Sequence, residues 1–211
     1  MAKLTTVVSG GQTGVDRAAL RAARDCGLAI GGWCPPGREA EDGPVPAEFP
    51  LRETPVERSP EAPAVPRSLR TEWNVRDSDA TLILRPAGSE AADAGTEWAA
   101  RCAERFGRPL LVCDPGDAEA ASTIGRWLAG QVPDAAPVRP PHSDVPPTRS
   151  IAFAQDDREG RPRDAGVPGS PIRRLNVAGP SEGTAPGIGR LAYSLLLKVF
   201  AAGSQNRPLI L

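Results

Sequence analysis

The chain has 211 residues, and its 25 Lys and Arg against 26 Asp and Glu give a formal net charge of −1. This balance argues against a nucleic-acid partner or an acidic membrane surface, because both attract an excess of basic residues. The 22 glycines and 24 prolines are about twice the usual share, and aromatic residues make up only 4%, which indicates a loop-rich protein.

Short apolar runs alternate with helical patterns along the chain. β-branched runs predict strands, and apolar residues repeating every three or four positions predict helices. We expect strands at 3–9, 28–30, 80–84, 110–113 and 175–178, and helices at 15–26, 70–76, 95–106, 118–128 and 188–199.

This alternation predicts an α/β fold, a Rossmann-like and mostly parallel sheet with helices on both faces. We interpret residues 1–211 as one domain that carries a long proline-rich loop at 31–68 and a loop insertion at 131–171. The insertion has too few apolar residues to form a core, so deleting about residues 134–169 should cost little stability.

The cysteines and the single histidine do not form a metal-binding or disulfide pattern. The four cysteines are far apart without a CxxC pair, and His142 lies in a proline-rich stretch, so we expect neither a metal nor a disulfide. Residues 1–30 lack the pattern of a signal peptide, and no apolar run approaches a membrane span. We therefore expect a cytoplasmic protein without a membrane partner.

The glycine-rich turn after the first strand is the strongest local motif. A turn of this kind directs backbone N–H groups and the positive end of a helix to one spot that suits an anion. Its GGxxG spacing matches neither a Walker A loop nor GxGxxG. The candidate residues are Gly10, Gly11, Gln12, Thr13, Gly14 and Asp16. Asp16 would complement the helix dipole or accept hydrogen bonds from a ribose or pterin, and the alternative is a tight turn without a ligand.

A valine at Gly11 is expected to abolish ligand binding and leave the fold nearly intact, because its side chain would fill the space of the anion.

The loop after the second strand offers an aromatic and a cationic candidate. Trp33 could stack on a flat ring and Arg38 could hold a phosphate, although a salt bridge from Arg38 to Glu41 or Asp42 explains the arginine equally well.

A third candidate lies at the start of the helix that follows the central strand. Gly95 and Thr96 would supply N–H groups and a hydroxyl, or Thr96 would only cap the helix. Asp77 and Asp79 precede their strand and are therefore interpreted as structural.

Five motifs make the sequence familiar: Ser9–Leu20, Gly31–Arg38, Ala40–Gly43, Arg70–Asp79 and Leu175–Pro180. Together they resemble the family of molybdenum carrier proteins. The resemblance implies a Rossmann-like fold, similar to the molybdenum cofactor carriers and more distantly to Lonely Guy type phosphoribohydrolases and DNA-processing protein A. It also implies a small phosphorylated ligand, with the molybdenum cofactor (molybdopterin) as the first candidate, and a homo-oligomer.

The chain departs from this family in the glycine motif of the third candidate, where Ala94 stands in place of a glycine. Arg70 is placed like the substrate arginine of the phosphoribohydrolases, but Glu97 directly follows Thr96 and does not reproduce their glutamate pair. The leading hypothesis is a non-enzymatic carrier. The alternatives are an enzyme acting on nucleoside monophosphates through Arg70 and Glu97, or a nucleotide-sensing module.

Overall fold

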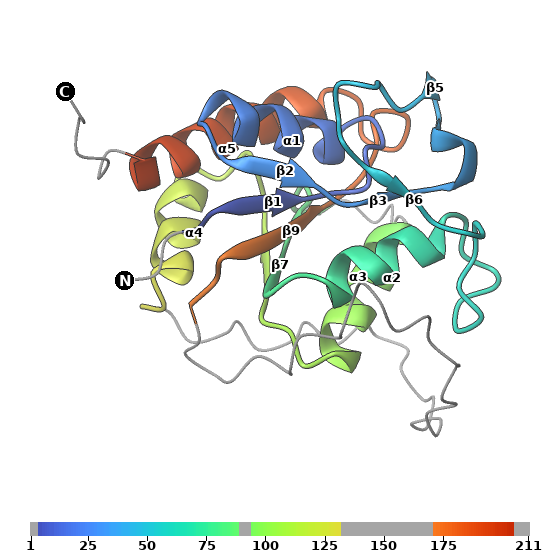
Figure 1. Cartoon of the computed structure of the whole chain (residues 1–211). Coiled ribbons are helices and arrows are strands. Elements are labelled where there is room, and N and C mark those ends of the chain that lie inside the picture. The colour runs from blue at the N-terminus through green and yellow to red at the C-terminus, as the bar shows by residue number, and fades with distance from the viewer. Residues whose placement is uncertain (1–3, 89–93, 132–170, 205–211) are drawn as a thin grey trace.

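The computed structural model describes residues 4–88, 94–131 and 171–204 (Figure 1). The strands are β1 (Thr6–Val8), β2 (Ala29–Gly31), β3 (Trp33–Cys34), β4 (Glu39–Ala40), β5 (Gly43–Pro44), β6 (Arg52–Glu53), β7 (Ala80–Leu84), β8 (Leu110–Cys113) and β9 (Arg174–Ala178). The helices are α1 (Val15–Asp25), α2 (Ser68–Arg76), α3 (Ala94–Arg105), α4 (Ala120–Leu128) and α5 (Ile188–Ser204), with one 3₁₀ turn, η1 (Pro36–Arg38).

The central sheet is parallel throughout and has the order β2-β1-β9-β7-β8. The last strand of the chain, β9, therefore takes the middle position between β1 and β7. If β9 is counted first, the order becomes 3-2-1-4-5, which is that of a Rossmann sheet. The predicted α/β Rossmann-like fold is confirmed, with the chain starting at a different strand.

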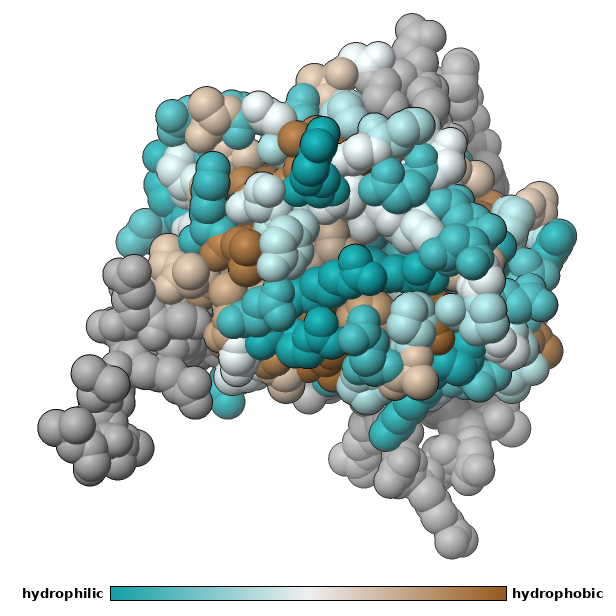
Figure 2. Space-filling model, turned by 90° about the horizontal axis from the view of Figure 1, so that it is seen from above, coloured by the Kyte–Doolittle hydropathy of each residue, from teal (hydrophilic) through white to brown (hydrophobic). Residues whose placement is uncertain are grey.

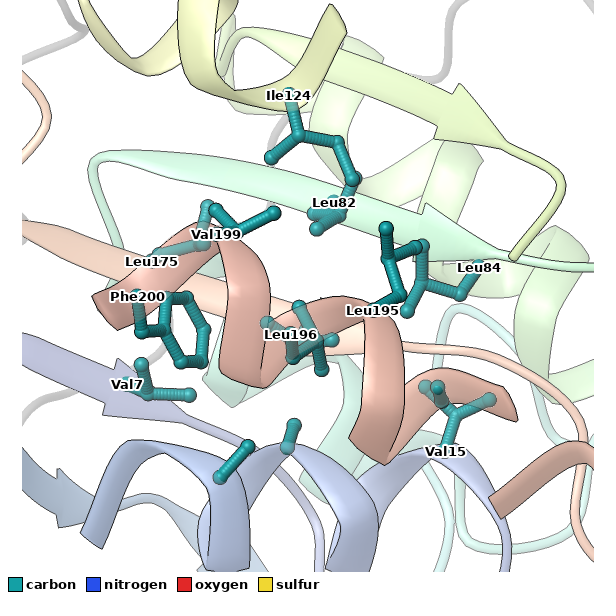
Figure 3. Packing of buried hydrophobic residues seen from close by; sticks show 14 of the residues in the cluster. Val7, Val15, Leu82, Leu84, Ile124, Leu175, Leu195, Leu196, Val199 and Phe200 are labelled. Atoms are coloured by element: carbon teal, nitrogen blue, oxygen red, sulfur yellow. The ribbon is translucent and has the colours of Figure 1, made fainter. Parts of the chain in front are cut away.

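Helices cover both faces of this sheet. α1, α4 and α5 pack on one face, and α2 and α3 pack on the other. Figure 3 shows the first of these layers, where Leu195, Leu196, Val199 and Phe200 of α5 lie against apolar side chains of the sheet and of the neighbouring helices. No helix in the described ranges is both long and apolar enough to cross a membrane.

Helix α1 follows directly from its sequence. Its buried alanines recur every three or four residues, and Arg21 and Arg24 lie on the opposite, exposed side. The helix ends where Gly27 adopts a φ of 72° and its N–H bonds the carbonyl of Arg24. A left-handed residue at this point closes the helix, as expected from the sequence.

The proline-rich segment is more ordered than a mostly irregular loop. β3 pairs with β6, and β4 pairs with β5 as a small hairpin. Val45, Phe49 and Leu51 are buried together against Leu20 of α1. The sequence pattern missed this cluster because its apolar residues follow no helical or strand period.

The other predicted elements lie within a few residues of the observed ones, whereas the insertion at 131–171 falls almost wholly outside the described residues. Asp77 and Asp79 are structural, as predicted. Asp79 accepts hydrogen bonds from the N–H groups of Arg173 and Arg174 at 2.9 and 2.8 Å, and thereby holds β9 beside β7.

Candidate functional site

A cavity of about 290 Å³ lies at the carboxyl edge of the sheet, where β1, β7 and β9 end. From β9, the strands extend to one side through β1 and β2 and to the other side through β7 and β8. Ligands of open α/β sheets bind at the point where the strand order changes direction in this way. The residues that line the cavity are Gln12, Asp16, Glu41, Pro66, Arg67, Arg70, Thr71, Ala94, Gly95, Thr96, Ala178, Gly179, Ser181 and Thr184. We refer to it as the edge cavity.

One wall of the edge cavity is a buried ion pair between α1 and α2. Arg70 donates from Nη1 to Asp16 Oδ2 at 2.9 Å, and the side chains are 15% and 3% exposed. A Cβ on Gly10 would lie 2.0 Å from that Nη1, so glycine is needed for Arg70 to pass the β1–α1 loop. Arg70 Nε is buried and has no hydrogen-bond partner, which leaves part of the guanidinium unsatisfied beside the cavity.

A second cation and four hydroxyl groups complete the polar lining. Arg67 starts α2 in the left-handed conformation, with a φ of 55°, and its side chain makes no ion pair with any residue that the structure describes. The hydroxyl residues come from α2, α3 and the loop after β9, and they are Thr71, Thr96, Ser181 and Thr184. Arginine and hydroxyl groups are the side chains that commonly hold phosphate.

The N–H groups of the glycine-rich turn were predicted to face an anion, but several of them bond to acceptors of the protein itself. The Gln12 N–H bonds Asp16 Oδ2 at 3.3 Å, the Thr13 N–H bonds the Gln12 side-chain oxygen at 3.0 Å, and the Val15 N–H bonds Pro180 O at 3.2 Å. These donors are occupied by the protein itself. The expected cradle of N–H groups is therefore largely closed, and the Gln12 and Asp16 side chains face the cavity instead.

The N-terminus of α5 is also occupied from within. Glu182 accepts the N–H groups of Gly187 and Gly189, both at 2.7 Å. A carboxylate in this position compensates the helix dipole and satisfies two of its first N–H groups. Side chains thus become the main means by which this site can hold an anion.

Glu41, at the tip of the β4–β5 hairpin, joins the two loops beside the cavity. Its Oε1 accepts the hydroxyl of Thr13 and the N–H of Gly183, the latter at 3.0 Å. Burial alone would raise the pKa of Glu41, but hydrogen bonds from Thr13, Ser181 and Gly183 outweigh it and lower the pKa below its ordinary value.

This lowered pKa predicts an acid-sensitive contact. The stabilisation from Glu41 is fully present above its unfolded pKa of about 4.3 and is lost as pH falls through the lower pKa of the folded state. Unfolding free energies of the wild type and Glu41→Gln, measured by urea titration, should differ by a constant amount above about pH 5 and converge below about pH 4. A difference that persists unchanged in acid would contradict this role.

Trp33 is not among the residues that line the edge cavity, where the sequence interpretation would have it stack on a ligand. Its indole Nε1 donates to Asp77 at 2.8 Å, and its backbone N–H donates to the Asn74 side chain at 2.7 Å. The ring meets Trp73 edge to face at a centroid distance of 4.7 Å. Trp33 therefore fixes β3 against α2.

Arg38 also lies away from the edge cavity and pairs with neither Glu41 nor Asp42. Its guanidinium makes four hydrogen bonds of 3.0 to 3.2 Å to backbone carbonyls of the following loop. The acceptors are Val45, Pro46, Phe49 and Leu51. The salt-bridge interpretation of Arg38 is wrong, because its partners are backbone groups that no side-chain pattern reveals.

This geometry predicts that Arg38→Ala affects stability before it affects binding. Losing these charge-assisted bonds should reduce the free energy of unfolding by about 1.5 to 3 kcal/mol. Limited proteolysis should cut the loop at 39–51 faster, and Arg38→Lys should restore little because lysine cannot reach carbonyls in several directions. Arg126→Ala, at an exposed position of α4, is the control. Wild-type stability of Arg38→Ala would refute the clamp.

Gly11 is not part of the edge-cavity lining either. A Cβ there would lie 2.7 Å from both Leu51 Cδ1 and Val45 Cγ1, inside the packed loop cluster. Thr13 and Gly14 line a different hollow, between α1 and α5, and Glu97 is not part of the edge-cavity lining. The predicted residues that do meet there are Gln12, Asp16, Arg70, Gly95 and Thr96.

Sequence reasoning missed several residues of the cavity, above all Glu41, Arg67 and Ser181. The motif at the end of β9 was recognised in the sequence. The sequence does not reveal the strand order, however, and only that order places the motif beside the β1–α1 loop. Among the residues with described positions, no three His, Cys, Asp or Glu side chains gather in a way that could hold a metal ion.

Comparison with known proteins decides the family. A model of the circularly permutated YpsA SLOG family matches residues 7–139, more than half of the chain. The chain belongs to this family. The family's description names a circular permutation. This agrees with the sheet, in which β9, the last strand of the chain, stands where a Rossmann sheet has its first strand. No protein with a curated description matches.

A crystal structure from Syntrophus aciditrophicus SB resembles this SLOG-family chain over nearly its whole length. It is described as a "Putative molybdenum carrier protein" and is 31% identical in sequence. The match covers 94% of this chain and 95% of that chain, with a TM-score of 0.66. The resemblance inferred from the five motifs is thereby confirmed.

Proposed function

We propose that this SLOG-family protein binds the molybdenum cofactor, or a closely related phosphorylated pterin, in the edge cavity and acts as a carrier. The observation that carries the proposal is the pair of arginines in the lining, since Arg67 has no ion-pair partner among the described residues and Arg70 has an unsatisfied Nε. A phosphate monoester placed between them could pair with both guanidinium groups.

The opposite side of the lining suits the other end of such a ligand. Asp16 and Glu41 supply carboxylate oxygens, whereas the Gln12 side-chain oxygen already accepts the N–H groups of Thr13 and Glu41. A pterin ring carries N–H donors on its pyrimidine edge, and carboxylate or amide oxygens accept such donors well. A cation side and an acceptor side in one cavity therefore match a ligand with a phosphate and a pterin.

A carrier fits this lining better than a phosphoribohydrolase. The enzymatic alternative requires Glu97 beside Arg70, and Glu97 lies outside the lining. The name of the Syntrophus protein supports a carrier as well. As in the sequence interpretation, we expect the carrier to act as a homo-oligomer.

A thermal-shift panel tests the proposal. Molybdopterin should raise the melting temperature, whereas molybdate, tungstate and a set of nucleotides should not do so through this cavity. Arg67→Ala should remove the shift, and Arg126→Ala should retain it. Release of a base from AMP would favour the enzymatic alternative, and a nucleotide shift that Arg67→Ala removes would favour a nucleotide sensor.

A further inference from the structure

A second hollow, with a volume of about 530 Å³, lies between α1 and α5 on the side of the sheet away from α2 and α3. Figure 2 views the molecule from this side, where hydrophilic residues prevail and hydrophobic ones show in smaller areas between them. Arginines from both helices line it, namely Arg17, Arg21, Arg24 and Arg190. We refer to it as the α1–α5 groove.

The carboxylates of the groove are already engaged by the protein. Asp42 receives two hydrogen bonds from Arg17, at 2.6 and 2.7 Å. Asp25 accepts the hydroxyl of Tyr193 at 2.7 Å, and Glu182 accepts two backbone N–H groups at the start of α5. All three carboxylates thus already have hydrogen-bond partners within the protein.

The arginines of the groove are not all engaged. Arg17 is held by Asp42, and Arg24 pairs with Glu48 at 3.0 Å. Arg21 and Arg190 are exposed and form no ion pair within the described ranges. Hydrogen bonds from Arg17 are the main cause of the lowered pKa of Asp42, and the charge of Arg21 adds a smaller contribution.

We propose that the α1–α5 groove is a second binding site, for a nucleoside diphosphate or a similar small molecule with a diphosphate group and a flat ring. Arg21 on α1 and Arg190 on α5 hold the diphosphate from the two walls, since guanidinium groups pair well with phosphate oxygens. The half-buried Tyr193 offers an aromatic surface for the ring. A hollow of this size lies within the range of small-molecule sites.

This site is distinct from the edge cavity. The two linings share no residue, and the arginines of one are not those of the other. Binding of a nucleotide in the groove is therefore compatible with a pterin, or with no ligand, at the sheet edge.

Isothermal titration calorimetry with ADP and with pyrophosphate tests the proposal on the full chain. ADP should bind with a stoichiometry near one, and the double variant Arg21→Ala/Arg190→Ala should weaken it by about tenfold or more. Arg126→Ala is the matched control for removing surface charge, and urea unfolding checks that the double variant remains folded. Pyrophosphate should bind more weakly than ADP, and Tyr193→Ala should reduce that difference.

Three results would overturn the proposal: no saturable binding of ADP, equal affinity in the wild type and the double variant, or affinity lost in Arg67→Ala but kept in the double variant. The last result would move the nucleotide to the edge cavity. Failure of molybdopterin to bind would overturn the proposed carrier function and leave this groove site unaffected.

Discussion

Arg70→Ala is expected to reduce the free energy of unfolding by about 3 kcal/mol and to abolish ligand binding in the edge cavity. Removing one partner of a buried ion pair leaves the other charge without its counter-ion, and Asp16 is only 3% exposed. The same substitution removes the guanidinium whose Nε is unsatisfied beside the cavity. Urea unfolding and molybdopterin titration measure the two effects.

A double-mutant cycle separates these effects. Asp16→Ala/Arg70→Ala should be more stable than Arg70→Ala alone, because the buried carboxylate is removed together with its counter-ion, but it should still fail to bind. If the two single substitutions add without coupling, the ion pair is not what stabilises the junction of α1 and α2.

Gly11→Val is expected to reduce the free energy of unfolding by about 3 kcal/mol, in contrast to the sequence-based expectation of a nearly intact fold. Two causes add up. Gly11 has a φ of 78°, where a β-branched residue is strained, and the new side chain would collide with Val45 and Leu51. Thermal and urea unfolding measure the loss.

Gly130→Val is the matched control for that experiment. Gly130 has a similar φ of 70°, but a Cβ there meets nothing within 4 Å. It should therefore show the backbone strain without the collision and lose clearly less stability than Gly11→Val. Equal losses in the two variants, with ligand binding lost only in Gly11→Val, would restore the view that Gly11 borders the ligand.

The fold was predictable because its elements obey local periods. The helix face from Val15 onward and the apolar run at 80–84 are visible in the sequence, and both are buried as expected. The central place of β9 was not predictable in this way. It depends on pairing with β1 and β7, which are far away in the sequence.

The candidate site was predictable only in part. Gln12, Asp16 and Arg70 were found because they stand beside a turn or within a recognisable motif. Trp33 and Arg38 were assigned to a ligand because an aromatic and a cation in a loop suit binding, yet the structure pairs them with α2 and with loop carbonyls. Such partners are set by tertiary packing and leave no local pattern.

The affinity for molybdopterin, measured by fluorescence titration of the wild type, Arg67→Ala and Arg21→Ala/Arg190→Ala, tests the central claim most directly. We predict saturable binding to the wild type, a loss of about tenfold or more in Arg67→Ala, and unchanged affinity in the groove variant. Equal affinity in the wild type and Arg67→Ala, or no binding to the wild type, would contradict the assignment of the edge cavity as a molybdenum-cofactor site.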